Sequence, residues 1–197
     1  CLSNAERTFG AIPNLMVGVP EGDQGFLNLR AAMPDHLSLP LLLSEKNGYQ
    51  TNFFCGADKS FDYMNEYLMF QKFDGIYGDV DFEKNQVLRE LEFEDGHTEK
   101  FNWGAEDRKV FEESIGKFKS SPFFNLYLTT SFHEPFAFEN QKYYEDKAKK
   151  RIEKLNPQRK TEYLNQIETF GALMYTDESV KKCFELYKER ADFGNTI

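Results

Sequence analysis

The sequence predicts an α/β fold, with a mostly parallel sheet flanked by helices. Residues 49–54 alternate like a strand and stand between two helical stretches, which is the order of βαβ units. The run Phe123–Leu128 is short, rich in aromatic residues and flanked by Pro122 and Pro135, so a buried strand is favoured over a helix. With 197 residues the chain is long enough for one domain with a sizeable core, and we expect a single domain over 1–197.

The N-terminal part is predicted to begin with a helix just after Thr8. Threonine is a good N-cap, and the apolar stretch that follows is closed by Gly18 and Pro20, although Pro13 removes one hydrogen bond. Two interpretations of Thr8 are open. It is a helix cap, which the local pattern favours, or a hydroxyl nucleophile at a helix N-terminus, where free N–H groups bind phosphate or sulfate.

Two further helices are predicted on either side of the first strand. Leu37–Lys46 is apolar and helical, and Asn47-Gly48 ends it. The stretch 60–71 has helical spacing with one apolar face. We expect that face in the core, and it consists of Phe61, Met64, Tyr67 and Leu68.

The middle of the chain is acidic and irregular from 74 to 102, with a hairpin or a lid over Leu91–Glu99. Trp103 lines a pocket or packs in the core, and the pattern supports both interpretations. An amphipathic helix over Arg108–Phe118 follows.

The stretch 137–174 is predicted to be a charged helical excursion within the domain, broken at Pro157. Its basic residues favour a solvated helix face. Attraction to an anionic lipid surface is the less favoured alternative, because acids are interleaved. Thr176-Asp177 then separates a helix over Glu162–Met174 from a last amphipathic helix, Glu178–Lys188.

Composition argues against a general nucleic-acid-binding surface. Forty per cent of residues are apolar and 29% are charged, and the net charge is −9, whereas nucleic acid requires a basic stripe. The three cysteines, Cys1, Cys55 and Cys183, are odd in number and lack metal-ligand spacing. They therefore predict neither a disulfide framework nor a zinc site.

The sequence contains no apolar run long enough to span a bilayer and no signal peptide. It starts at Cys1, and its last residues, 194–197, look like the start of another strand. We therefore expect the chain to be a fragment of a longer protein.

Polar side chains follow the strand Phe123–Leu128. Thr129, Thr130 and Ser131 come directly after it, and His133 lies two residues further on. A buried strand that ends in titratable side chains is how α/β enzymes present chemistry at the carboxyl edge of a parallel sheet. The alternative, a core strand that merely turns here, is supported equally by this stretch alone.

Several different short motifs also follow one another along nearly the whole chain. They are Arg7-Thr8 with Gly18-Val19-Pro20, 48–56 (GYQTNFFCG) with 61–65 (FDYMN), 73–77 (FDGIY), 103–107 (WGAED), 129–136 (TTSFHEPF), and Tyr175-Thr176-Asp177 with Asn195-Thr196-Ile197. Together they resemble the lipoteichoic acid synthase-like phosphoglycerol transferases, which are membrane-anchored members of the alkaline phosphatase/sulfatase superfamily.

The resemblance implies an alkaline phosphatase/sulfatase-like fold, incomplete at both ends of this chain, and assigns roles to several residues. Thr8 is implied to be the nucleophile and a ligand of a divalent metal, Mn²⁺ or Mg²⁺, whose other ligands are expected outside this chain. His133 is implied to contact the phosphate or the leaving group. The implied substrate-binding residues are Arg7, Cys55, Trp103 and Ser131.

These residue types suit the implied chemistry. A hard cation binds oxygen ligands, lowers the pKa of a hydroxyl and neutralises phosphoryl oxygens. A histidine near the leaving oxygen donates a proton, and a phosphothreonine intermediate divides the transfer into two steps. The implied activity is metal-dependent transfer or hydrolysis of phosphoglycerol-type head groups on anionic lipids or glycans, by a membrane-anchored protein with this domain on the extracytoplasmic side. The chain alone is expected to be inactive.

Three positions depart from the family pattern. Cys55, Ala57 and Met64 stand where some of these enzymes have a histidine, an aspartate and an arginine for the glycerol-phosphate head. A non-catalytic lipid-binding or sensor domain on the same fold is therefore one alternative. A sulfuric-ester or phosphoethanolamine enzyme of the same superfamily is another, although the chain has no Cys/Ser-x-Pro-x-Arg segment of a formylglycine sulfatase.

Overall fold

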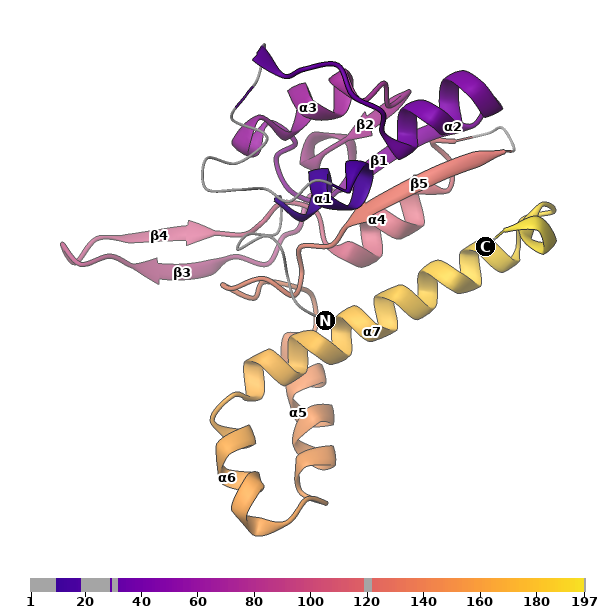
Figure 1. Cartoon of the computed structure of the whole chain (residues 1–197). Coiled ribbons are helices and arrows are strands. Elements are labelled where there is room, and N and C mark those ends of the chain that lie inside the picture. Colours follow the sequence, from indigo (N-terminus) through magenta and orange to yellow (C-terminus); the bar gives the residue numbers. More distant parts are fainter. Residues whose placement is uncertain (1–9, 19–28, 30–31, 119–121, 197) are drawn as a thin grey trace. The chain divides into compact units, whose positions relative to one another are not determined.

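The computed structural model describes residues 10–18, 29, 32–118 and 122–196 (Figure 1). Internal contacts divide the chain into two compact units, which we describe separately. The sheet unit comprises the described residues of 10–54, 58–78 and 118–128, and the helical unit comprises 55–57, 79–117 and 129–196. The predictions for Arg7 and Thr8 lie outside the described residues.

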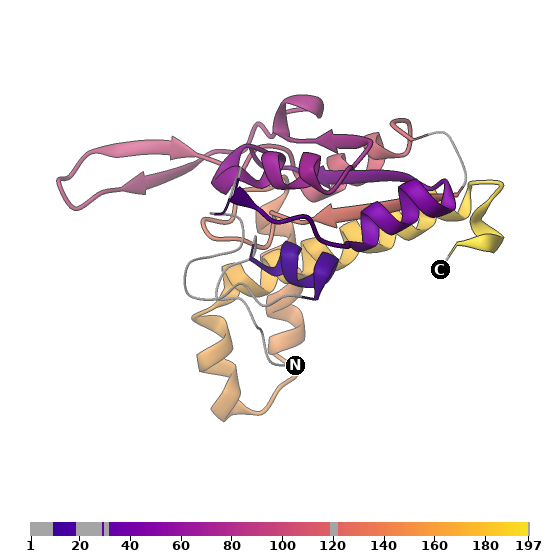
Figure 2. The ribbon, with the colours of Figure 1, turned by 45° about the horizontal axis from the view of Figure 1, so that its top comes forward.

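The sheet unit contains three strands in the order β2-β1-β5. β1 spans Gln50–Cys55, β2 spans Gly75–Tyr77 and β5 spans Phe123–Leu128, and β5 lies beside β1 in both views (Figures 1 and 2). β1 and β2 are parallel and are connected through α3, Met64–Phe70, which confirms the predicted βαβ unit. The fold is therefore the predicted mixed α/β fold.

The central strand β1 is the apolar centre of the sheet unit. Phe53 and Phe54 have no exposed surface. The ring of Phe54 stacks between Tyr77 of β2 and Tyr127 of β5, with ring centroids 5.1 Å and 4.9 Å away. Aromatic pairs at this spacing add stability beyond the area that they bury, so the sheet is held laterally by side chains as well as by its backbone ladder.

Two helices of this unit begin later than predicted, for local reasons. α1 is Ala11–Val17 with Gly10 at its N-cap, rather than starting just after Thr8. This start puts Pro13 in the first turn, where its missing N–H has no intrahelical partner to lose. α2 is Leu39–Asn47, because the Ser38 hydroxyl accepts the Leu41 N–H and caps the helix there.

The helix predicted over 60–71 is broken near its start. A 3₁₀ turn, Phe61–Tyr63, precedes α3, and Asp62 and Tyr63 have φ of 54° and 61°. The break turns Phe61 off the helix face, so its side chain is 57% exposed and its predicted place in the core is wrong. The rest of the predicted face, Met64 with Tyr67 and Leu68, is buried.

The helical unit begins with a hairpin and a short helix. β3, Arg89–Glu92, pairs antiparallel with β4, Thr98–Phe101, which confirms the hairpin interpretation of 91–99. α4 is Asp107–Ser114 and starts one residue before the predicted helix. Its first residue, Asp107, is important for the site described below.

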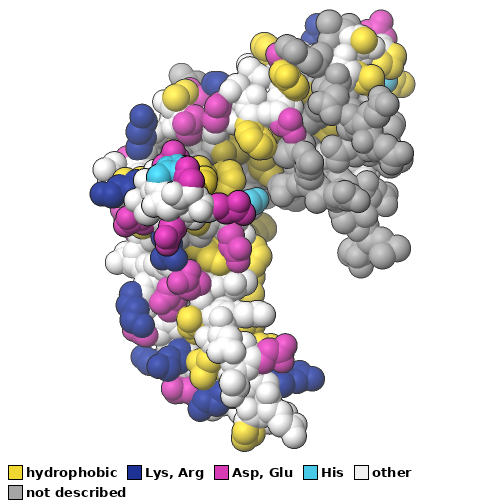
Figure 3. Space-filling view, turned by 90° about the vertical axis from the view of Figure 1, so that its left-hand side faces the viewer, with side chains coloured by type: hydrophobic (Ala, Val, Ile, Leu, Met, Phe, Trp, Pro, Cys, Tyr) yellow, Lys and Arg dark blue, Asp and Glu magenta, His cyan; other side chains and the backbone are white. Residues whose placement is uncertain are grey.

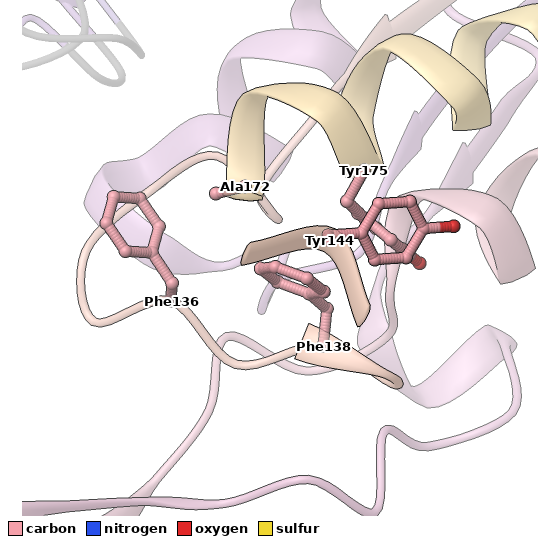
Figure 4. Close-up of a cluster of buried hydrophobic side chains, with 5 residues drawn as sticks. All are labelled: Phe136, Phe138, Tyr144, Ala172 and Tyr175. Atoms are coloured by element: carbon pink, nitrogen blue, oxygen red, sulfur yellow. The ribbon is translucent and has the colours of Figure 1, made fainter. Parts of the chain in front are cut away.

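Three helices complete the unit: α5 (Gln141–Ile152), α6 (Pro157–Leu164) and α7 (Ile167–Lys188). Their core is a cluster of buried residues, Phe136, Phe138, Tyr144, Ala172 and Tyr175 (Figure 4). The rings of Phe138 and Tyr175 stack with centroids 4.5 Å apart. Gly171 brings α7 close to α5, since a Cβ there would lie 3.1 Å from Glu145 Cγ.

Two predictions for this C-terminal part need correction. Pro157 starts α6 instead of breaking a helix, because Asn156 accepts the Arg159 N–H and proline is tolerated at the first position. Thr176-Asp177 does not divide a helix, and α7 runs through it for 22 residues. Residues 193–195 form a 3₁₀ turn and Thr196 is extended, so the strand predicted to start at the end of the chain stays a prediction. The excursion itself, 137–174, stays a prediction.

Candidate active site

The loop 129–136 after β5 carries the polar side chains that the sequence singled out, and the start of α4 holds it in place. Oδ1 of Asp107 accepts the backbone N–H groups of Thr130 and Ser131, at 2.7 Å and 3.2 Å. In return, the Ser131 hydroxyl accepts the Asp107 N–H at 3.0 Å. The exchange caps α4 from outside its own sequence and fixes the loop backbone.

The other carboxylate oxygen of Asp107, Oδ2, is buried and has no hydrogen-bond partner among the described residues. Burial is the largest effect on this carboxyl and raises its pKa, against the opposing effect of the Thr130 and Ser131 N–H groups. Since Asp107 is only 2% exposed, the loop is held by a carboxylate that water scarcely solvates.

A second close approach joins the start of α4 to the turn after β1. The Ala105 N–H donates to the Gly56 carbonyl at 2.8 Å. A Cβ on Gly56 would lie 2.1 Å from Ala105 O, and one on Gly104 would lie 2.2 Å from Gly56 O. Gly104 also has φ of +104°, which side chains rarely adopt. Both glycines are therefore needed for the backbones to meet.

His133 lies at the surface of the loop, against Trp103. The two rings meet edge to face, with centroids 4.4 Å apart, and Trp103 also packs against Phe101. Nδ1 of His133 lies 2.7 Å from the carbonyl oxygen of Glu134. Because a carbonyl only accepts, Nδ1 carries a proton in this contact, and Nε2 is the ring nitrogen that the contact leaves available.

The structure brings together three of the predicted site residues, Trp103, Ser131 and His133. Trp103 Nε1 is buried without a hydrogen-bond partner in the described part of the chain. Ser131 is 5% exposed, and its hydroxyl is engaged by Asp107.

Cys55 lies elsewhere, at the end of β1. It has no exposed surface, and its sulfur accepts the Ala57 N–H at 3.4 Å. It is a free thiol. The predicted substrate-binding role of Cys55 therefore stays a prediction. The predicted roles of Arg7 in substrate binding and of Thr8 as nucleophile and metal ligand also stay predictions, because both residues lie outside the described ones.

Sequence reasoning did not assign roles to Glu106, which directly precedes Asp107, or to Tyr175, which bonds to Glu106. The Tyr175 hydroxyl donates to Glu106 Oε2 at 2.6 Å, and the Glu139 N–H donates to Oε1 at 2.9 Å. Burial raises the pKa of Glu106 and is only partly opposed by these two donors. The available signal was that both residues belong to the motifs WGAED and YTD.

The described residues do not on their own form a metal centre. Within them, no three His, Cys, Asp or Glu side chains gather closely enough to hold a metal ion. The one metal ligand that the resemblance implies in this chain, Thr8, lies outside them.

A membrane anchor was also expected for the full protein. Of the helices in the described ranges, none combines the length and the apolar character that a membrane span requires.

The chain is similar to known proteins over nearly its whole length. The Sulfatase family model matches residues 3–197. Lipoteichoic acid synthase 1 of Bacillus subtilis (strain 168) is 26% identical over 198 residues, which cover 99% of this chain and 26% of that protein. The chain thus spans about a quarter of the length of this relative.

Two solved structures share its fold. The lipoteichoic acid synthase LtaP from Listeria monocytogenes matches with a TM-score of 0.65 and 18% identity, over 96% of this chain and 41% of that one. A protein in the alkaline phosphatase superfamily from Vibrio parahaemolyticus matches with a TM-score of 0.59 and 20% identity, over 94% and 40%. The expected family and fold are both confirmed: the chain belongs to the Sulfatase family and has the alkaline phosphatase superfamily fold.

Proposed function

We propose that the full-length protein transfers or hydrolyses phosphoglycerol-type head groups of anionic lipids or glycans outside the cytoplasmic membrane, with Thr8 as the nucleophile. Membership of the Sulfatase family supports phosphoryl or sulfuryl transfer or hydrolysis as the general chemistry. The observation that carries the finer proposal is the loop of His133, whose backbone Asp107 fixes and whose ring rests against Trp103.

His133 suits a proton-transfer role in this scheme. In the first step the Thr8 oxygen attacks phosphorus, its own proton passes to solvent, and the bond to the leaving alcohol breaks. Protonated Nε2 of His133 gives its proton to the leaving oxygen. In the second step an acceptor hydroxyl or water attacks the phosphothreonine, Nε2 takes the acceptor's proton, and the Thr8 oxygen leaves and regains a proton from solvent.

Divalent-metal dependence is part of the proposal, because the resemblance implies it. A cation would neutralise the phosphoryl oxygens. The described residues do not form its ligand set, so no step above is routed through it.

The threonine intermediate is tested directly by trapping. The full-length protein is mixed with phosphatidylglycerol, quenched in acid and digested, and the peptide that begins at Thr8 is analysed by mass spectrometry. We expect a glycerophosphoryl adduct on Thr8, and its loss in Thr8→Ala. In His133→Ala, the adduct should form more slowly by about 10²–10⁴-fold, whereas the control His97→Ala should match the wild type. An adduct on another residue would contradict the role of Thr8.

The second candidate, a non-catalytic lipid-binding domain, is favoured by one observation. Cys55 stands at a head-group position of the family, yet its sulfur is buried and accepts a backbone N–H. Lipid binding without any adduct or turnover in the same experiment would support this candidate.

A further inference from the structure

The turn between α5 and α6 has a charge opposite to that of the whole protein. We call residues 149–160 the basic tip. It carries six basic side chains and one acidic one, Glu153, which gives a net charge of +5 in a chain whose net charge is −9. The basic residues are Lys149, Lys150, Arg151, Lys154, Arg159 and Lys160.

Within the part of the chain that the structure describes, no acidic side chain pairs with these basic residues. Neighbouring lysines have partners: Lys142 pairs with Asp146, and Lys147 pairs with Glu178. By contrast, none of the six basic residues of the tip forms an ion pair with another described residue. Five of them are exposed and Lys160 is half-buried. Of the interleaved acids that disfavoured an anionic partner in the sequence, only Glu153 thus lies in the tip.

The tip also exposes an apolar side chain, Leu155, next to a buried residue of α5. Ile152, on the last turn of α5, is only 5% exposed and anchors the helix, whereas Leu155 in the following turn is 43% exposed. In Figures 1 and 2 this turn forms the end of the α5–α6 pair that lies away from α7. In Figure 3 dark blue basic side chains are spread over the lower part of the view, where α5 and α6 lie, with hydrophobic side chains among them.

We propose that the basic tip docks the protein on the surface of an anionic phospholipid bilayer. Unpaired Lys and Arg side chains are attracted to the negative surface of such a membrane. The tip gathers six of them in twelve residues, so their contributions add at one point of contact. The exposed Leu155 among them adds an apolar group that enters the head-group region. This side chain is why a bilayer is favoured over a soluble polyanion, which offers it no apolar phase.

The docking proposal goes beyond the proposed function, because it concerns where the protein is held and not which bond is broken. Sedimentation measures binding and not turnover, so failure of the docking proposal would leave the threonine chemistry untouched. Equally, failure of that chemistry would leave docking intact.

The test is sedimentation of the full chain with vesicles of phosphatidylglycerol and phosphatidylcholine in equal parts. The variant replaces Lys149, Arg151, Lys154 and Arg159 by Gln, all exposed and away from the candidate site. A matched variant replaces four exposed lysines elsewhere, Lys46, Lys72, Lys84 and Lys100, and makes the same change in net charge. Near-wild-type thermal unfolding of both variants verifies that they are folded.

We expect the wild type to sediment with the anionic vesicles and not with phosphatidylcholine alone. The tip variant should bind at least about 100-fold more weakly, since each basic residue near the surface contributes about a five-fold factor. The matched variant should bind like the wild type, and Leu155→Ser should bind several-fold more weakly.

Three results would overturn the proposal. They are equal loss in both charge variants, equal sedimentation with neutral vesicles, or unchanged vesicle binding by Leu155→Ser together with equally tight binding to long-chain polyphosphate. The last result would assign the tip to a soluble polyanion.

Discussion

The carboxylate of Asp107 holds the backbone of Thr130, whose N–H donates to Oδ1 at 2.7 Å. The two residues are 23 positions apart, and the bond connects the first turn of α4 to the loop that carries His133. Both groups are shielded from water. In such surroundings the loss of a hydrogen-bond partner lowers the stability of the fold, because no water replaces the partner that the remaining polar group has lost.

The first prediction therefore concerns the side chain of Asp107. Asp107→Ala leaves two loop N–H groups without their acceptor and should lower the free energy of unfolding by about 2–5 kcal/mol. Asp107→Asn keeps an acceptor oxygen in place and should lose less than half of that. Urea denaturation of the two variants measures the difference. Equal losses would mean that the hydrogen bonds contribute nothing beyond the negative charge.

The second prediction concerns pH. Burial raises the pKa of Asp107, so the folded state binds a proton more tightly than the unfolded state. Stability from this carboxyl is therefore fully present below its ordinary pKa, about 4, and is lost as pH rises through its raised pKa.

The measurement is the difference in unfolding free energy between wild type and Asp107→Asn over a pH series. As pH rises, the wild type should lose unfolding free energy relative to Asp107→Asn. Glu106 also has a raised pKa and stays in both proteins, so it cancels in the difference. A difference that is constant with pH would contradict the buried state of this carboxyl.

The third prediction separates crowding from backbone strain at Gly104. A Cβ there would meet Gly56 O at 2.2 Å, and φ is +104°. Gly104→Ala should cost about 3–5 kcal/mol, from both the positive φ and the collision. Gly96 is the control, because its φ is +82° but a Cβ would meet nothing within 4 Å. Gly96→Ala should cost only about 1–2 kcal/mol, and equal losses in thermal or urea unfolding would refute the close approach.

The fourth prediction uses Trp103, the one tryptophan of the sequence, as a reporter for His133. Their rings are in contact, with centroids 4.4 Å apart. His133→Ala removes this contact and should change the intensity and wavelength of tryptophan emission. His97→Ala, in the hairpin tip where the histidine stacks on Phe93, should leave emission unchanged. An identical spectrum in His133→Ala would show that the contact does not form in solution.

Much of the fold follows from local signals in the sequence. The strand β5 was predicted because a short aromatic run between prolines favours a buried strand over a helix. The end of α2 was predicted because Asn47-Gly48 is a typical helix end. In the structure Gly48 has a φ of 68°, which glycine adopts without strain. Family and fold were predicted from ordered motifs, and the match over residues 3–197 confirms them.

Other features depend on contacts that no local pattern contains. β2 has only three residues and is a strand because it pairs with β1. The exposure of Phe61 depends on two left-handed residues that interrupt a helical pattern. Asp107 looks like an ordinary acid at the start of a helix, and its role is visible only when Thr130 lies beside it.

The central claim, a threonine-dependent reaction on an anionic lipid, is tested most directly by the product. The full-length protein is incubated with phosphatidylglycerol and Mn²⁺, with and without a chelator, and diacylglycerol is followed by mass spectrometry. We expect release that the chelator stops and that Thr8→Ala abolishes. Release that persists in Thr8→Ala, or no release from a protein shown to bind the lipid and the metal, would contradict the account.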